Sequence, residues 1–310
     1  MKQEKSPRFR GLIAGLCLIG LAAAGLFFTH GGGDTLPLRA EKTPEEGAEM
    51  SEVVPDNNDL PPEAEMEISG DEKKEMPPGP YVAIVIDDFG FSRAIADGYE
   101  KVSLPLTWAV IPFQAHSSYA AERAEAAGIS YMIHMPMAAE SDRKWDQKAG
   151  VIDTGMTADA VSDLIQNALE SLPGALGMNN HRGSRATGDA ELMDAVMTEL
   201  ASTSLFFLDS RTSSKSVAYR TAREKGIPAA FCSIFLDHEP SEEFMERQYE
   251  RGISLAAKRG WVVMIAHARA GTLEYLSKFS ERDDLEATFV TMPELMDILW
   301  SGSPLAARGD

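Results

Sequence analysis

The sequence predicts an α/β fold in which seven or eight parallel strands, alternating with helices, form a closed or nearly closed (β/α) barrel. Short apolar runs alternate with amphipathic segments from residue 81 almost to the end of the chain. The first run, residues 81–86, is entirely apolar or aromatic and rich in β-branched side chains. Such a run is typical of a strand buried on both faces, as in a parallel sheet covered by helices.

Eight runs have the length and composition of strands, and five segments between them show the apolar spacing of helices. The expected strands are residues 82–86, 106–111, 131–134, 176–180, 205–208, 229–235 and 262–266, with residues 287–290 as an optional eighth. The expected helices are residues 117–127, 157–172, 189–201, 216–225 and 241–259.

The N-terminal segment, residues 1–30, predicts a membrane anchor. Residues 11–28 carry no charge, and Arg8 and Arg10 precede them. An apolar run of this length spans a bilayer, and basic residues before it favour a cytoplasmic N-terminus. We therefore expect a single-pass protein of the bacterial inner membrane, with a cleaved signal peptide as the alternative.

Residues 31–80 have the composition of a linker. They contain 14 acidic and 4 basic residues, several prolines and few large apolar side chains. Such a segment cannot bury enough apolar surface to offset the loss of conformational entropy on folding, so we expect a disordered acidic tether. The tether leads to the barrel domain, residues 81–310, which we expect in the periplasm.

The charge of the chain argues against nucleic acid as a partner. The formal net charge is -19, and no basic cluster occurs beyond the N-terminus. Binding to phosphates requires a basic face. The two cysteines, Cys17 and Cys232, lie in an apolar N-terminal run and an expected core strand, and do not form a disulfide framework.

Polar side chains follow nearly every expected strand, where the chemistry of a (β/α) barrel gathers. Asp88, His134 and His181 provide three ligands of the kind that hold a divalent metal and leave a position for water or substrate. Asp87 could accept a proton from a metal-bound water, and His267 could return one to a leaving group. The alternative for any single histidine is a hydrogen-bonded structural role.

Five ordered motifs resemble the divergent polysaccharide deacetylase family, the YibQ-like envelope proteins, which is distantly similar to the NodB-type carbohydrate esterases. The motifs are residues 86–90, 134–137, 177–184, 207–212 and 265–267. The resemblance implies a distorted NodB-type (β/α) barrel over about residues 80–300. It also implies that Asp87 is the general base, Asp88 a metal ligand and His267 the acid.

The sequence departs from the NodB pattern in one respect. The NodB-type enzymes take two imidazoles from a His-x-x-x-His motif, but Ala138 stands four residues after His134, which leaves His181 as the second imidazole. The resemblance also implies an arginine that orients the base, and Arg182, Arg185 and Arg211 are all candidates.

Further residues at the strand ends are candidates for the pocket. Asn179 and Asn180 are expected to contact sugar hydroxyls, to support the ligands from behind, or to form turns. Asp209 either lines the pocket or caps the next helix. Arg182, Ser184 and Arg211 complete this group of substrate-binding or supporting residues.

Two functions follow from the resemblance and the residues together. The first is a metal-dependent deacetylase, with zinc as the expected metal, acting on an acetylated envelope polysaccharide or a peptidoglycan-type glycan. The alternative is a non-catalytic glycan-binding or envelope-assembly protein built on the same barrel.

Overall fold

A computed structural model describes residues 79–142 and 150–300 of the chain. The anchor and linker expected in residues 1–78, Trp145 and residues 301–310 lie outside the described residues. Within the described residues, no helix is both long and apolar enough to cross a membrane.

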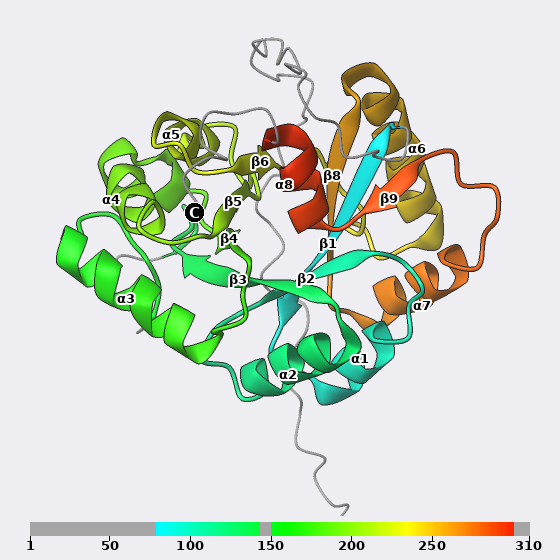
Figure 1. The fold of residues 1–310 in the computed structure, drawn as a ribbon, viewed down its shortest axis with the longest axis horizontal. Helices are drawn as coiled ribbons and strands as arrows, with labels where there is room; N and C mark the ends of the chain where they lie inside the picture. The colour runs from blue at the N-terminus through cyan, green and yellow to red at the C-terminus, as the bar shows by residue number, and fades with distance from the viewer. Residues whose placement is uncertain (1–78, 143–149, 301–310) are drawn as a thin grey trace, which may run out of the picture. The chain divides into compact units, whose positions relative to one another are not determined.

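The described residues form one sheet of parallel strands with helices around it (Figure 1). The strands are β1 (Tyr81–Phe89), β2 (Leu106–Val110), β3 (Ser130–Met137), β4 (Gly177–Arg182), β5 (Phe206–Asp209), β6 (Ala229–Phe231), β7 (Ile234–Phe235), β8 (Trp261–His267) and β9 (Thr288–Val290). The helices are α1 (Arg93–Tyr99), α2 (Ser117–Ala127), α3 (Ala158–Ser171), α4 (Ala190–Leu200), α5 (Ala218–Glu224), α6 (Glu242–Arg259), α7 (Ala270–Phe279) and α8 (Met292–Trp300), with a 3-10 turn at Ala186–Gly188. The parallel α/β architecture predicted from the sequence is confirmed.

The strands run in the order β6-β5-β4-β3-β2-β1-β8-β7, and β9 pairs with the first residues of β1. All pairs between strands are parallel. The sheet is a half-barrel, because no ladder joins β6 to β7 among the described strands. The expectation of a closed or nearly closed barrel is therefore corrected to a half-barrel.

The opening arises where the sequence analysis expected a single strand, residues 229–235. The chain crosses there from one edge of the sheet to the other. Cys232 donates its backbone N–H to Asp209 on the β5 side (2.8 Å), whereas Ser233 donates to Val263 in β8 (2.9 Å). The run is thus divided into β6, which pairs with β5, and β7, which pairs with β8. The two residues between them cannot form the crossover that a parallel ladder between consecutive strands requires.

Two apolar clusters cover the faces of the sheet. The larger one contains apolar residues of α1 to α7 packed against the strands, and the smaller one contains alternate residues of the strands together with α8. In the smaller cluster Met292, Leu295 and Met296 of α8 contact the face that includes Val85 and Val263. Figure 1 shows α8 beside β1, β8, β5 and β6.

Four helices, α1, α3, α4 and α6, begin after a residue whose side chain caps them. Ser92, Thr157 and Ser241 each accept a hydrogen bond from the backbone N–H three residues later, and Asp189 accepts from the backbone N–H groups of Glu191 and Leu192. These side chains satisfy N–H groups that have no partner within the helix. Each of these four helices therefore starts at a defined residue, which helps to keep the loop before it in place.

Candidate functional site

Alternation along the strands turns a row of polar side chains toward the inner face of the half-barrel. Val85 in β1, Met132 in β3 and Ile265 in β8 belong to the smaller apolar cluster, which lies on the inner face of the sheet. Two residues further on, at the strand ends, stand Asp87, His134 and His267. Because side chains repeat every second residue in a strand, these polar groups share the inner face. An apolar interior thus ends in a polar site.

Asp88 follows Asp87 and reaches the site through an irregular backbone. The register of β1 against β2 shifts between Ile86 and Phe89, and Asp88 has φ +68°. A bulge of this kind re-aims a side chain that regular alternation would direct to the other face. Backbone in the left-handed region is costly for a residue other than glycine and often marks functional sites.

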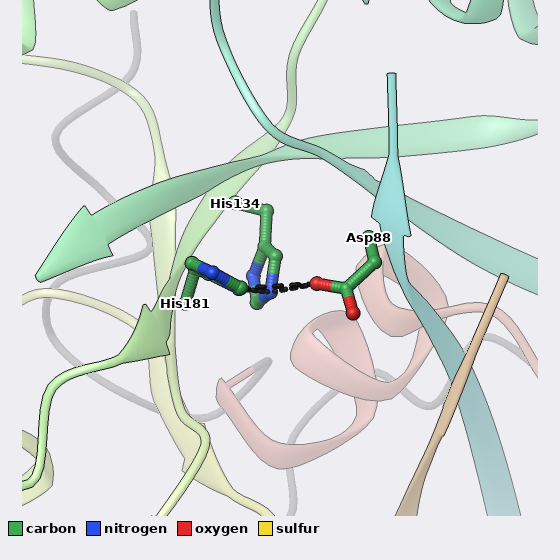
Figure 2. Close-up of side chains that lie close together, drawn as sticks. All are labelled: Asp88, His134 and His181. Atoms are coloured by element: carbon green, nitrogen blue, oxygen red, sulfur yellow. Dashed lines mark hydrogen bonds and ion pairs between the residues drawn. The ribbon is translucent and has the colours of Figure 1, made fainter. Parts of the chain in front are cut away.

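Three ligand atoms from β1, β3 and β4 converge (Figure 2). Asp88 Oδ1 lies 3.0 Å from His181 Nδ1 and 3.3 Å from His134 Nε2. The two ring nitrogens are 3.1 Å apart. Tetrahedral ligands with zinc bonds of about 2.0–2.1 Å lie roughly 3.3–3.4 Å from one another. The triangle therefore has nearly the size of one face of a tetrahedral site.

The environment of Asp88 also fits a cation. Its Oδ1 is buried and has no well-aligned hydrogen-bond donor among the described residues. Burial by itself would raise the pKa of Asp88, but the imidazoles of His134 and His181 hold this pKa well below its usual value. Asp88 is thus ionised at neutral pH, as a metal ligand must be.

Asp87 lies behind this triangle and is almost completely buried. Its Oδ1 accepts a hydrogen bond from Asn179 Nδ2 (2.9 Å), and its Oδ2 lies 3.6 Å from His134 Nε2. Burial raises the pKa of Asp87, although His134 and His267 oppose that effect. A carboxylate with a raised pKa is a better proton acceptor than a free one.

His267 ends β8 directly beside Asp87, since the two residues are partners in the β1–β8 register. Its Nδ1 lies 2.7 Å from Asp237 Oδ1. The other oxygen of Asp237 accepts hydrogen bonds from the His267 backbone N–H (2.8 Å) and from Thr272 Oγ1 (2.6 Å). Burial lowers the pKa of His267, but Asp237 outweighs burial and raises it to about 9. His267 is thus protonated at neutral pH.

Asp237 is a functional candidate that the sequence analysis did not assign to the site. Its side chain is buried, and the charge of His267 together with these hydrogen bonds overcomes the effect of burial and lowers its pKa. The available signal was its position just after the expected strand 229–235, the same kind of position that identified the other candidates.

Three other predicted pocket residues, Asn180, Arg182 and Ser184, contact the loops beside β4. Asn180 Oδ1 accepts from the backbone of Ser210 (2.9 Å) and Asn180 Nδ2 donates to Arg182 O (2.6 Å). Arg182 pairs with Asp142 (2.8 Å), and Ser184 Oγ accepts from the backbone of Glu140 (2.9 Å). These contacts join the end of β4 to the loops beside it.

Asp209 and Arg211 likewise hold the end of β5. Asp209 accepts hydrogen bonds from Ser216 Oγ (2.7 Å) and from the Tyr219 backbone in the first turn of α5 (3.2 Å). The guanidinium of Arg211 lies 4.6 Å above the ring of Phe231. Asp209 thus links the end of β5 to the first turn of α5.

The three arginines that were candidates for orienting Asp87 contact other groups in the structure. Arg182 pairs with Asp142, Arg185 with Asp153 (2.9 Å), and Arg211 stacks on Phe231. The amide of Asn179 donates a hydrogen bond to Asp87. The uncharged amide of Asn179 stabilises the ionised carboxylate of Asp87 less than the guanidinium of an arginine would.

The fold and site define a parallel α/β half-barrel with a candidate metal centre, flanked by a buried carboxylate and an imidazole, at the carboxyl ends of its strands. Comparison with known proteins gives the family. Residues 84–296 match the divergent polysaccharide deacetylase family, and the chain belongs to it. The resemblance seen in the sequence is thereby confirmed.

Two relatives are named as uncharacterised proteins. One, from Haemophilus influenzae, is 37% identical over 195 residues, which cover 63% of this chain and 69% of the relative. The other, YibQ of Escherichia coli, is 30% identical over 216 residues, covering 70% and 67%. An uncharacterised protein of Agrobacterium tumefaciens has a similar solved fold, with a TM-score of 0.67 at 19% identity over 71% of this chain and 90% of that one.

Proposed function

We propose that this chain is a metal-dependent deacetylase that removes acetyl groups from an acetylated envelope polysaccharide or a peptidoglycan-type glycan. The observation that carries the proposal is the position of Asp87 and His267 beside the Asp88, His134 and His181 triangle. A metal-binding group, a proton acceptor and a protonated donor thus stand within one site. Membership of the deacetylase family supports the substrate class.

The residues of the triangle suit zinc. Two imidazoles and one carboxylate are a common ligand set of catalytic zinc, which keeps a further position open for water or substrate. A zinc ion held there would polarise the acetyl carbonyl and lower the pKa of a water molecule. Its ligands come from three strands of a rigid sheet, which keeps their geometry in place during turnover.

The remaining steps are assigned to the chain's own groups. Asp87 accepts a proton from the attacking water as the new C–O bond forms at the acetyl carbon. His267 donates its proton to the nitrogen or oxygen of the glycan as the bond from that atom to the acetyl carbon breaks. The products are acetate and a free amine or hydroxyl group. Asp237 holds His267 by Nδ1, which directs Nε2 as the proton donor.

Two exposed aromatic side chains are suited to a sugar substrate. Phe91 follows β1 and is 58% exposed, and Phe113 follows β2 and is 51% exposed. The two loops are joined, because the His116 backbone N–H donates to Gly90 O (2.9 Å). Phe113 has φ +65°, an unusual conformation for a bulky residue. Aromatic faces pack against the C–H faces of pyranose rings, so we assign both to glycan binding.

The location of the enzyme is proposed from the sequence alone. The anchor expected in residues 1–30 and the acidic linker expected in residues 31–80 would put the catalytic domain on the periplasmic side of the inner membrane. An envelope glycan is accessible there.

Acetate release tests the proposed activity directly. The purified protein is incubated with acetylated chitooligosaccharides or peptidoglycan fragments in the presence of zinc, cobalt or manganese, and compared with Asp87→Asn and His267→Ala. We expect release by the wild type far above both variants. A wild type that binds metal and glycan but releases no more acetate than the variants would establish the non-catalytic alternative.

A further inference from the structure

Asn179 lies between Asp87, the proposed base, and His134, a proposed metal ligand, and its amide contacts both side chains. It is fully buried in β4. Its Nδ2 donates to Asp87 Oδ1 (2.9 Å) and to Ser210 Oγ (3.3 Å). Its Oδ1 lies 2.7 Å from Nδ1 of His134. One amide therefore connects a carboxylate of β1 with an imidazole of β3.

The orientation of this amide is determined by Asp87. An ionised carboxylate can only accept hydrogen bonds, so the NH₂ group of Asn179 must face Asp87. The carbonyl oxygen of the amide then faces His134. The opposite orientation would place two acceptors against each other at a fully buried position, where an unsatisfied polar pair is costly.

The amide oxygen in turn determines the tautomer of His134. Because Asn179 Oδ1 can only accept, the hydrogen between the two residues belongs to His134 Nδ1. In the neutral imidazole, Nε2 is then unprotonated and its lone pair is free. Nε2 is the ring nitrogen that belongs to the triangle, 3.3 Å from Asp88 Oδ1 and 3.1 Å from His181 Nδ1.

We infer that Asn179 is a positioning residue that prepares His134 for the metal and links that preparation to the base, Asp87. The inference rests on the proposed function and deepens it. Asn179 touches neither the metal position nor the reacting atoms. Groups that hold a metal-binding histidine from behind commonly change metal affinity by about 10- to 100-fold when removed.

Asn180 provides a matched control. It is the next residue along β4 and is equally buried, and its amide is also hydrogen-bonded at both ends. Its partners are backbone groups of Ser210 and Arg182, and none of them belongs to the triangle. Loss of fold stability is expected from either substitution, whereas loss of the His134 tautomer is expected only from Asn179→Ala.

The experiment compares wild type, Asn179→Ala and Asn180→Ala in two measurements that do not depend on turnover. Nitrogen-15 NMR of the metal-free protein at alkaline pH, where the imidazoles are neutral, reports the His134 tautomer. Calorimetric titration with zinc reports the affinity. We expect a single Nδ1–H tautomer in wild type and Asn180→Ala, and a mixture with roughly 10- to 100-fold weaker zinc binding in Asn179→Ala.

Exchanging the side chains of Asp87 and Asn179 tests whether the contact between them can be restored. The double variant Asp87→Asn/Asn179→Asp keeps a donor facing an acceptor, and it keeps an acceptor facing His134. We expect Asn179→Asp alone to weaken folding through repulsion from Asp87, and the double variant to regain stability, the Nδ1–H tautomer and zinc binding while lacking deacetylase activity.

Two results would overturn the inference. One is an Nε2–H tautomer in the wild type. The other is zinc affinity that falls equally in Asn179→Ala and Asn180→Ala, or in neither. If Asn179→Ala does not fold, the double variant Asp87→Asn/Asn179→Asp tests the inference. Failure of this double variant to regain zinc binding would contradict the proposed contact. Absence of acetate release by the wild type would reject the deacetylase proposal and leave these two measurements valid.

Discussion

The carboxylate of Asp237 contacts His267 at two points. One oxygen lies 2.7 Å from the ring Nδ1, and the other accepts a hydrogen bond from the His267 backbone N–H at 2.8 Å. The ring is held in one orientation as a result, and the buried carboxylate favours its charged form. The proposed proton donor of the site is thus paired with a residue 30 positions away in the sequence.

Asp237→Asn should move the alkaline limb of the pH–activity profile to lower pH. The pKa of His267 is about 9 because Asp237 outweighs the effect of burial, so removal of the charge lowers this pKa. Activity that requires protonated His267 then ends at lower pH. Histidine titration by NMR together with rate measurements checks the shift. The acidic limb of the profile is assigned to Asp87, whose pKa burial raises above 3.8, and the midpoint of this limb should not move in the variant.

The same variant should lose stability in a defined pH window. The pKa of His267 is raised in the folded state, so its contribution is complete below pH 6.5 and is lost as the pH rises through about 9. The pKa of Asp237 is lowered, so its contribution is present above pH 3.8. Asp209→Asn is the control, because it removes an equally buried carboxylate outside the site. An unchanged His267 pKa in Asp237→Asn would contradict the assignment.

His181→Ala should weaken zinc binding by more than about a hundredfold, because it removes a whole coordination bond. Calorimetric titration of the purified protein measures the affinity. His116→Ala serves as the control, since the His116 imidazole contacts Arg93 (3.4 Å) and lies outside the triangle. Equal affinity in wild type and His181→Ala would exclude His181 as a ligand.

Asp87→Asn should reduce the rate of acetate release by roughly 10² to 10⁴, the usual contribution of a general base, and leave zinc affinity nearly unchanged. The substitution keeps the size of the side chain and its capacity to accept from Asn179. Steady-state rates and zinc titration of the same preparation separate the two effects. A parallel loss of both would identify Asp87 as a ligand and reject its role as base.

Phe91→Ala and Phe113→Ala should each weaken binding of chitooligosaccharides by about 1 kcal/mol, close to a fivefold change, with little effect on zinc binding. Leu176→Ala is the matched control. Leu176 is a similarly exposed apolar residue, but it precedes β4 at the opposite end of the strands. Equal loss of glycan affinity in Leu176→Ala would show that the two phenylalanines form no specific subsite.

Fusion of reporters after Asp310 tests the proposed location. A reporter active only in the periplasm should give a signal, because the basic residues before the apolar run favour a cytoplasmic N-terminus. A cytoplasmic reporter fused at the same point should stay silent. The reverse pattern would overturn the proposed topology.

Much of the architecture could be predicted from the apolar runs that mark the strands in the sequence. Buried parallel strands read as apolar runs, and the active groups of such a sheet stand where the runs end. Asp87, Asp88, His134, His181 and His267 were selected on this basis, and the structure brings the ligand atoms of three of them together. The break between β6 and β7 was not visible, because residues 229–235 are apolar on both sides of the crossing.

The sequence by itself determined the parallel α/β class, the family and the strand ends that carry the polar groups, because each is written in local patterns of a few residues. Tertiary structure decided the openness of the sheet, the partner of His267 and the group that holds Asp87. Asn179 and Asp87 are 92 residues apart, and their contact exists only through the register of β4, β3, β2 and β1. That register depends on packing across the whole sheet, and no local pattern specifies it.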